Sequence, residues 1–287
     1  MKLLILGSSG QLGKSLIKRL KYENIICLNK TDLDITNKKN VILKINEISP
    51  NIVINAAAYT NVDQAEQYDE LAFSVNASGP ENLVEACKIK SIPLIHISSD
   101  YVFDGLKGSP YFPSDCPNPI GIYGKSKLAG EKFIENYERG FVIRTSWLFS
   151  EFNNNFYKTI LNLANQKHEI TIVKDEVGSP TYAGDLADAI QRTIPLIASE
   201  ELPAEIYHFG GDEPCSWHQF AEVIIAEGYH QKKIKSLPSI IPVKSEEFHK
   251  TDLIRPKFSA LNSSKLCRAL DMNASHWKAA VSMLMLK

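Results

Sequence analysis

The spacing in this sequence that most directly suggests chemistry is a tyrosine, Tyr123, followed four residues later by a lysine, Lys127. Residues four apart on a helix lie on the same face, so the phenol and the ammonium would share one site. A free tyrosine titrates at about pH 10, and a neighbouring cation favours its ionised form. Such a pair can exchange a proton with a reacting oxygen. Because this spacing often arises by chance, it needs support from other residues.

A serine provides that support. Ser99 follows a predicted buried strand, 93–98, and would lie at the carboxyl edge of a parallel sheet, where such folds bind their ligands. Its hydroxyl can hydrogen-bond the same reacting oxygen. The alternative is a hydroxyl that only caps the next loop, and without Tyr123 and Lys127 that alternative would be preferable. The three residues together are the candidate catalytic set.

A glycine-rich turn, Gly7 to Gly13, reads GSSGQLG between a predicted buried strand, 3–6, and an amphipathic helix. Its Gly-x-x-Gly-x-x-Gly spacing permits a tight turn, close approach of the backbone to a pyrophosphate, and close packing of the helix on the strand. The spacing differs from Gly-x-Gly-x-x-Gly and resembles the short-chain dehydrogenase variant. In this strand–turn–helix context, a turn without a ligand is the weaker interpretation. The turn therefore predicts a bound dinucleotide.

The end of the second predicted strand, 25–28, indicates which dinucleotide binds. An NAD-selective enzyme usually places a carboxylate there to hold the ribose 2′-hydroxyl, whereas this chain has Asn29 and Lys30. Lys30 can meet a 2′-phosphate, with a solvated loop lysine as the equal alternative. Asp34 is placed to reach the adenine, or else it caps a turn. We expect NADPH as the preferred cofactor, with NADH also usable.

Alternating strands and helices must position these residues. Strand, helix and strand repeated along a chain mean parallel pairing with right-handed crossovers. We therefore expect an α/β fold: a Rossmann-like, doubly wound parallel sheet with a smaller mixed α/β substrate-binding lobe. Further predicted strands are 52–57, 141–146, 170–173 and 206–209, and predicted helices are 37–48, 66–89, 121–136, 156–166 and 181–198.

The alternation of predicted strands and helices becomes less regular after about residue 150. The last part of the chain carries four prolines among mixed short patterns: Pro214, Pro238, Pro242 and Pro256. We expect residues 1–150 and 183–210 to form the dinucleotide-binding Rossmann domain. Residues 151–182 and 211–287 would form the substrate-binding lobe.

The composition excludes several classes of protein. The 32 Lys and Arg nearly cancel the 33 Asp and Glu, so no net field recruits nucleic acid or an anionic membrane. The five scattered cysteines contain no Cys-x-x-Cys pair, which predicts reduced packing residues rather than disulfides or a zinc site. No apolar run approaches the roughly 20 residues of a membrane span. We expect a cytoplasmic protein without nucleic-acid or membrane partners.

Histidine contexts exclude further chemistry. None of the seven histidines lies in a Gly-x-Ser-x-Gly or His-Glu-x-x-His motif, so hydrolase and zinc-protease functions lack their necessary parts. His96, on the strand that leads to Ser99, is expected to be a packed core residue.

Longer motifs occur in order along nearly the whole chain. They are the glycine turn, NAAAYTNVDQAE at 55–66, SSDYVF at 98–103, YGKSKLAGE at 123–131, RTSW at 144–147, GSPT at 178–181, and RP followed by SALN within 255–262. With these motifs the chain resembles the dTDP-4-dehydrorhamnose reductase family, which are extended short-chain dehydrogenases/reductases acting on nucleotide sugars.

The resemblance implies a role for each matching residue. Tyr123 would be the proton donor, Lys127 its electrostatic partner and a ribose ligand, and Ser99 an orienting hydroxyl where family members often have threonine. Trp147 is alternatively a core aromatic, and Arg255 alternatively a surface ion pair. The implied cofactor contacts are Gly7, Gly10, Gln11, Leu12, Gly13, Asn29, Lys30, Asp34, Ile35, Ala56, Ala57, Ala58, Tyr123 and Lys127. The implied substrate contacts are Val62, Asp100, Tyr101 and Trp147 for the sugar and Arg255 for the diphosphate.

The resemblance also bears on metal and assembly. Some family members dimerise through magnesium held by acidic residues on the first helix and after the GSPT motif. Here Asp185 and Asp188 are acidic, but the first-helix position is Ser15, a hydroxyl in place of a carboxylate. We therefore expect no metal, and a monomer or weak homodimer.

The implied activity is NAD(P)H-dependent reduction of the 4-keto group of dTDP-4-dehydro-L-rhamnose to dTDP-L-rhamnose, for polysaccharide biosynthesis. One alternative is a reductase or epimerase of another nucleotide sugar, because the same fold and residues serve related reactions. A second is a non-catalytic regulatory subunit resembling that of methionine adenosyltransferase. The intact Tyr123, Lys127 and Ser99 argue against the second.

Overall fold

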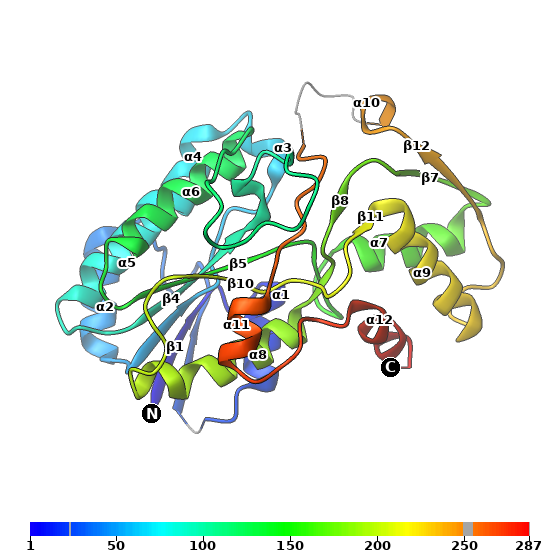
Figure 1. Cartoon of the computed structure of the whole chain (residues 1–287). Coiled ribbons are helices and arrows are strands. Elements are labelled where there is room, and N and C mark those ends of the chain that lie inside the picture. The colour runs from blue at the N-terminus through cyan, green and yellow to red at the C-terminus, as the bar shows by residue number, and fades with distance from the viewer. Residues whose placement is uncertain (23, 249–254, 287) are drawn as a thin grey trace.

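The computed structural model describes residues 1–22, 24–248 and 255–286, and its centre is a six-stranded parallel sheet in the order β10-β5-β4-β3-β1-β2 (Figure 1). The order reverses between β1 and β3, because β2 and β3 flank β1 on opposite sides, which makes the sheet doubly wound as predicted. The strands are β1 (Lys2–Leu6), β2 (Asn24–Leu28), β3 (Ile52–Asn55), β4 (Leu94–Ser99), β5 (Gly140–Thr145) and β10 (Ile206–His208).

Successive residues of β1 enter two different cores, one on each face of the sheet. Leu3 and Ile5 pack with α1 (Gln11–Arg19) and α8 (Ala183–Ala198). Leu4 and Leu6 pack on the opposite face. That face is covered by α2 (Lys38–Ile48), α5 (Gly79–Lys88) and α6 (Ile122–Glu135). A strand buried on both faces explains why the sequence shows a continuous apolar run.

The predicted helix 66–89 is wrong in detail, because this stretch is interrupted. Asn76 lies in a π-helical turn and exchanges hydrogen bonds with the backbone of Tyr59, at 2.8 and 3.0 Å. Asn76 Nδ2 also donates to Ser126 Oγ on α6 at 3.0 Å. A Cβ at Gly130 would lie 2.0 Å from the Asn76 carbonyl, so glycine permits this close approach. The elements are α3 (Val62–Ala65), α4 (Asp69–Phe73), the π turn η1 (Ser74–Ser78) and α5.

A second core lies beside the sheet and is built from later parts of the chain (Figure 1). It packs α7 (Phe156–Gln166), α9 (Trp217–His230) and α12 (Trp277–Met285) against β7 (Glu169–Val173), which pairs with β12 (Ser239–Val243). The remaining elements are β6 (Leu148–Phe149), β8 (Val177–Gly178), β9 (Thr181–Tyr182), β11 (Cys215–Ser216), η2 (Asp100–Val102), α10 (Ser245–Phe248) and α11 (Ser264–Ala269).

The division of the chain into a Rossmann domain and a lobe stays a prediction. Leu266 and Leu270, which that division assigns to the lobe, pack with the core of the central sheet.

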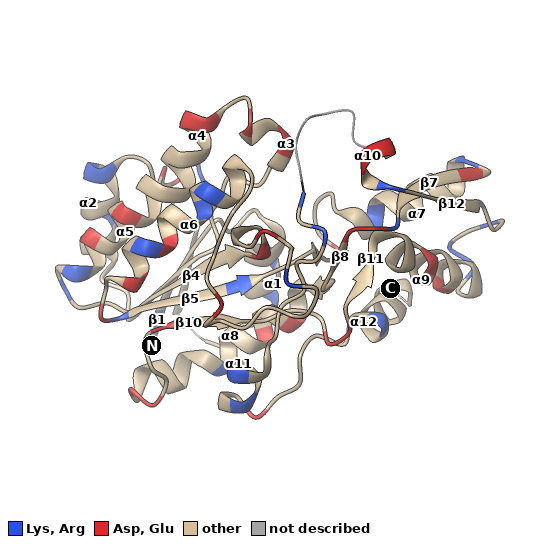
Figure 2. Ribbon diagram, turned by 45° about the horizontal axis from the view of Figure 1, so that its top comes forward, with Lys and Arg blue, Asp and Glu red and all other residues tan. Residues whose placement is uncertain are grey.

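The distribution of charge, the length of the helices and the state of the cysteines bear on the expectations drawn from the composition. Basic and acidic residues are interspersed over the helices (Figure 2). No helix among the described residues is long and apolar enough to cross a membrane. All five cysteines are free, but Cys116 is exposed, which corrects the expectation that each is a packing residue.

Candidate active site

A cavity of about 650 Å³ lies at the carboxyl ends of the central strands. The strand ends β1, β3, β4 and β5 all contribute residues, as expected for a ligand site at the switch point of a doubly wound sheet. Most of the predicted site residues line it: Gly7, Gly10, Gln11, Leu12, Asn29, Lys30, Asp34, Ile35, Ala56, Ala57, Ala58, Val62, Ser99, Asp100, Tyr101, Tyr123, Lys127 and Trp147. The structure therefore brings residues from distant parts of the chain around one space.

The glycine turn is shaped for a close backbone approach. Gly7 has a φ of +77°, and a Cβ there would lie 2.6 Å from the backbone of Ala56 and Ala57. A Cβ on Gly13 would lie 2.3 Å from the Gly7 carbonyl, so Gly13 packs the helix against the turn and does not itself line the cavity. No side chain caps the N-terminus of α1 at Gly10, which leaves backbone N–H groups for an anion. These features fit a dinucleotide pyrophosphate.

The turn after β2 contains a carboxylate, but it points at the backbone. Asp32 Oδ2 accepts a hydrogen bond from the Asn29 N–H at 2.9 Å, and Asp32 does not line the cavity. Lys30 does line it. The Thr36 backbone N–H lowers the pKa of Asp34, with Lys30 adding a smaller effect in the same direction. Asp34 thus caps the turn, as in one of the two alternatives, and also lines the cavity, while its contact with the adenine stays a prediction.

The candidate catalytic residues meet at the end of β4. Tyr123 is partly exposed to the cavity, and its desolvation there raises its pKa to about 12, while a hydrogen bond from Ser99 acts in the opposite direction. Burial lowers the pKa of Lys127 to about 8, with Glu131 opposing it. The phenol is therefore protonated at neutral pH, as a proton donor must be. Lys127 Nζ donates to the Ile97 carbonyl at 2.7 Å, which holds it in the cavity lining.

Ser99 belongs to a buried chain of hydroxyl and carboxyl groups. Its Oγ lies 3.0 Å from Asp100 Oδ1, and the Ser259 hydroxyl donates to Asp100 Oδ2 at 2.6 Å. Burial raises the pKa of Asp100 to about 7, with Ser259 and Ser99 opposing the rise. Ser259 comes from the C-terminal part of the chain, so this contact ties that part to the end of β4. The sequence did not indicate the link.

Aromatic rings form the other wall of the cavity. Trp147 has a φ of +46°, which is unusual for a bulky residue, and its ring stacks on Trp217 with centroids 3.4 Å apart. Tyr101 meets Tyr123 edge to face at 5.4 Å between centroids. Trp147 therefore lines the cavity and also packs against the second core. Trp217 was not predicted as a site residue, because no recognisable motif lies near it in the sequence.

Several polar residues of the site were also missed. The hydroxyls of Ser98 and Thr145 are buried without a hydrogen-bond partner among the described residues, and both line the cavity. Unpartnered buried hydroxyls are costly, so they point to a polar ligand. Thr145 stands in the RTSW motif, which could have signalled it. Asn153 and Asn154 also line the cavity, and Asn153 Nδ2 donates to the Ser9 carbonyl at 2.9 Å.

Arg255 lies beside the cavity without lining it. Its Nη2 pairs with Asp63 at 2.6 Å, and the Tyr101 side chain is close enough to affect its pKa. The structure thus shows the ion pair that was one of the two expectations for Arg255. Its role as a diphosphate ligand stays a prediction.

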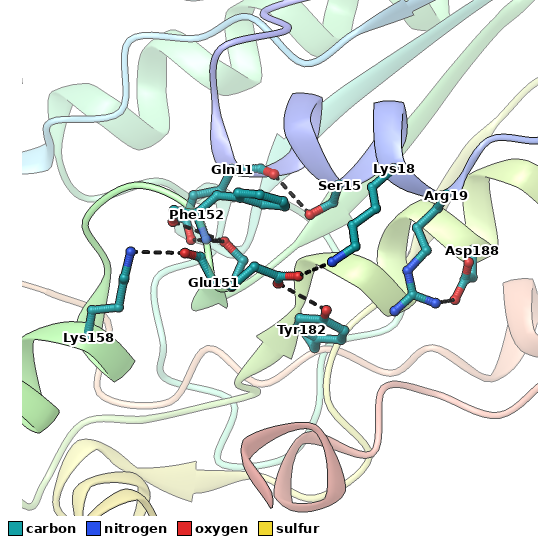
Figure 3. A network of polar contacts seen from close by, with 10 residues as sticks. Gln11, Ser15, Lys18, Arg19, Glu151, Phe152, Lys158, Tyr182 and Asp188 are labelled. Carbon is teal, nitrogen blue, oxygen red and sulfur yellow. Dashed lines mark hydrogen bonds and ion pairs between the residues drawn. The ribbon is translucent and has the colours of Figure 1, made fainter. Parts of the chain in front are cut away.

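The residues of the suggested magnesium site do not fit that ion. Ser15 is buried and donates to the Gln11 carbonyl at 3.0 Å, while Arg19 pairs with Asp188 at 2.8 Å (Figure 3). The guanidinium thus already neutralises that carboxylate. Asp185 accepts a hydrogen bond from Ser275 at 2.7 Å. No group of three or more metal-ligating side chains occurs in the described part of the chain.

We expect catalytic activity to survive chelation with EDTA, because an arginine occupies the position where a cation would be needed. Turnover, and the oligomeric state from sedimentation, are measured with and without EDTA, and again after magnesium is added. A loss of activity that magnesium restores would contradict this expectation.

The parallel sheet, the glycine turn and the grouping of Ser99, Tyr123 and Lys127 at one cavity define a short-chain dehydrogenase/reductase. The chain belongs to the family described as "RmlD substrate binding domain", whose sequence model matches residues 1–287.

Individual relatives span the same length. The chain is 41% identical to a dTDP-4-dehydrorhamnose reductase of Aggregatibacter actinomycetemcomitans, over 98% of this chain and 97% of that one. It is 37% identical to the spore coat polysaccharide biosynthesis protein SpsK of Bacillus subtilis, over 98% and 95%. The crystal structure of dTDP-4-dehydrorhamnose reductase from Bacillus anthracis in complex with NADP superposes with a TM-score of 0.91 at 36% identity, covering 100% of this chain and 99% of that one.

Proposed function

We propose that this protein uses NADPH to reduce the 4-keto group of dTDP-4-dehydro-L-rhamnose, giving dTDP-L-rhamnose for polysaccharide biosynthesis. The observation that carries the proposal is the meeting of Tyr123, Ser99 and Lys127 at the end of a cavity that begins at the glycine turn. Full-length relatives named for this reaction support the choice of substrate.

The chain's own residues supply the proton that the reduction requires. When bound in this cavity, a reduced nicotinamide would supply the hydride. Tyr123 donates its proton to the oxygen that gains negative charge, which is general-acid catalysis. Ser99 orients that oxygen, and the positive charge of Lys127 favours the phenolate that remains on Tyr123. Gly7, Gly10 and the first turn of α1 would hold the cofactor pyrophosphate.

The remaining contacts are proposed on the same grounds. Val62, Asp100, Tyr101 and Trp147 would contact the sugar, and Arg255 the diphosphate. We also propose a cytoplasmic location and a monomer or weak homodimer. The five free cysteines support a reducing compartment.

The test is oxidation of NADPH by the purified chain with a panel of nucleotide-linked 4-keto sugars, followed by identification of the product. We expect the highest kcat/KM with dTDP-4-dehydro-L-rhamnose. Faster turnover of another nucleotide sugar would favour the related reductases or epimerases. No turnover with any of them would favour a non-catalytic subunit.

Cofactor preference provides a further prediction at Lys30. A partly exposed lysine–phosphate contact contributes about 1 kcal/mol, so NADPH should be preferred over NADH by roughly tenfold or less, and less at high salt. Lys30→Glu should reverse the preference, because the new carboxylate repels a 2′-phosphate and accepts from a 2′-hydroxyl. The measurement is kcat/KM for both cofactors. The control is Lys39→Glu, which makes the same charge change outside the cavity.

An unchanged cofactor ratio in Lys30→Glu would show that Lys30 does not face the ribose. Strong selectivity of the wild-type protein for NADH would show the same.

A further inference from the structure

A buried histidine that the proposed reaction does not use lies directly against the catalytic lysine. His96 on β4 is the register partner of Asn55 on β3, so their side chains lie on the same face of the sheet. His96 is fully buried. Its Nε2 lies 3.4 Å from Lys127 Nζ on α6, and its Nδ1 lies 3.0 Å from Asn55 Nδ2. The imidazole therefore bridges Asn55 and the candidate catalytic lysine.

The orientation of the Asn55 amide is determined by the backbone. Asn55 Oδ1 accepts a hydrogen bond from the Ala57 N–H at 3.1 Å. A flipped amide would turn its NH₂ group against that N–H, so the NH₂ group must face His96. Because an amide NH₂ group can only donate, Nδ1 of His96 must accept.

The protonation of His96 follows from this contact. Burial, reinforced by the charge of Lys127, holds the pKa of His96 well below its usual value, so the ring is neutral. A neutral imidazole carries one proton, and with Nδ1 accepting, that proton is on Nε2. The Nε2–H then points at Lys127 Nζ. An ammonium has no lone pair to accept it, whereas a neutral amine does.

We propose that His96 is a positioning residue for Lys127: Asn55 places the imidazole proton on Nε2, and this N–H favours the neutral amine of Lys127 over the ammonium. In the amine state, Nζ accepts from His96 and donates to the Ile97 carbonyl at 2.7 Å. The protein then provides both a hydrogen-bond donor and a hydrogen-bond acceptor for the lysine nitrogen.

The other charged groups near Lys127 do not replace this effect. Glu131, on the same helix, favours the ammonium but is held by Arg144 on β5 at 2.7 Å. The other titratable groups that line this end of the cavity, among the described residues, are Asp100, Tyr101 and Tyr123. The lowered pKa of Lys127, about 8 with burial as the main cause, agrees with an amine that is accessible near neutral pH.

The neutral amine of Lys127 forms when the phenolate of Tyr123 is protonated again. After the phenol has given its proton to the product oxygen, a proton leaves the Lys127 ammonium and ends on the phenolate, and solvent returns one to the amine. The Nε2–H of His96 stabilises the amine formed between these two transfers. This consequence rests on the proposed function, whereas the tautomer of His96 does not.

The tautomer is measured directly by ¹⁵N NMR of the full chain labelled at histidine. We expect His96 to show a protonated Nε2 and an unprotonated Nδ1, unchanged from about pH 6 to 8. His208 is an internal control of the opposite kind, because its Nδ1 lies 2.9 Å from the Tyr111 carbonyl and must carry the proton. His96→Gln identifies the His96 signal by its loss. A proton on Nδ1 of His96 would overturn the proposal.

The effect on Lys127 is measured with Asn55→Asp, which keeps the acceptor for Ala57 and turns the donor into a second acceptor. His96 then carries its proton on Nδ1, and its Nε2 lone pair accepts from the ammonium. Because the ammonium is needed to stabilise the phenolate, activity falls as pH rises through the pKa of Lys127. We expect this alkaline limb of kcat to move up by about one pH unit or more in Asn55→Asp.

Two further variants separate the tautomer from the added charge. His96→Gln keeps an acceptor and an N–H donor, so its alkaline limb should stay close to that of the wild type. The double variant His96→Gln, Asn55→Asp carries the new charge without an imidazole, and its limb should move less than that of Asn55→Asp alone. Equal shifts in the two, or coincident limbs in Asn55→Asp and wild type, would overturn the proposed role. Absence of turnover in wild type contradicts the proposed function instead, and the NMR result still decides the tautomer.

Discussion

Replacing Tyr123 by phenylalanine is expected to lower kcat for ketone reduction by about 10² to 10⁴-fold, the usual contribution of a general acid. Phenylalanine keeps the ring and its edge-to-face contact with Tyr101, so the cavity keeps its shape. What it loses is the phenolic proton, which is bound firmly at neutral pH because burial raises the pKa of Tyr123 to about 12. The binding of NADPH should therefore remain nearly unchanged.

The measurement is kcat for NADPH oxidation, together with the Kd for NADPH from cofactor fluorescence. Tyr111→Phe is the matched control, because it also removes one phenolic hydroxyl, and that hydroxyl bonds to Asp104 at 2.8 Å outside the cavity. If Tyr123→Phe kept more than half of the wild-type turnover, Tyr123 would not be the acid.

Removing the positive charge of Arg144 is expected to destabilise the protein by about 3 to 5 kcal/mol. Arg144 donates to both oxygens of Glu131, at 2.9 and 2.7 Å, and the two side chains are 1% and 0% exposed. Arg144→Met keeps much of the side-chain volume but leaves the carboxylate of Glu131 buried without its partner. The cost of an isolated buried charge is the physical reason for the large effect.

Urea denaturation measures this loss as a lower midpoint at unchanged slope. The double variant Arg144→Met, Glu131→Met should be considerably more stable than Arg144→Met alone, because it removes the unpaired charge as well. A double variant no more stable than the single one would show that the loss comes from packing and not from the buried charge.

Most strands of the central sheet and most of the longer helices were predicted from the sequence, because their signals are local. An apolar run such as Leu3 to Leu6 marks a buried strand wherever it stands, and the predicted helix 156–166 coincides with α7. The interrupted stretch 62–88 was less predictable. Its π turn depends on Asn76 meeting Tyr59 and on α6 approaching closely at Gly130, and no local pattern contains those contacts.

The residues of the candidate site were likewise predictable only where their signals are local in the sequence. Tyr123 and Lys127 share one turn of helix, and the glycine turn needs only its own spacing, so both could be found from short stretches of sequence. Trp217 enters the cavity wall only because it stacks on Trp147, which lies seventy positions away in the chain. Its type and neighbours in the sequence suit a helix N-terminus equally well.

The sequence by itself determined the class of fold and predicted the cofactor turn and the proton donor, since each depends on the order of nearby residues. Only the tertiary structure decided how the donor's surroundings are charged and hydrogen-bonded. His96 was expected to be a packed core residue, and it is buried, but register pairing with Asn55 and the covering helix place it against Lys127. Burial and the direction of a hydrogen bond decide protonation, and both are properties of the assembled chain.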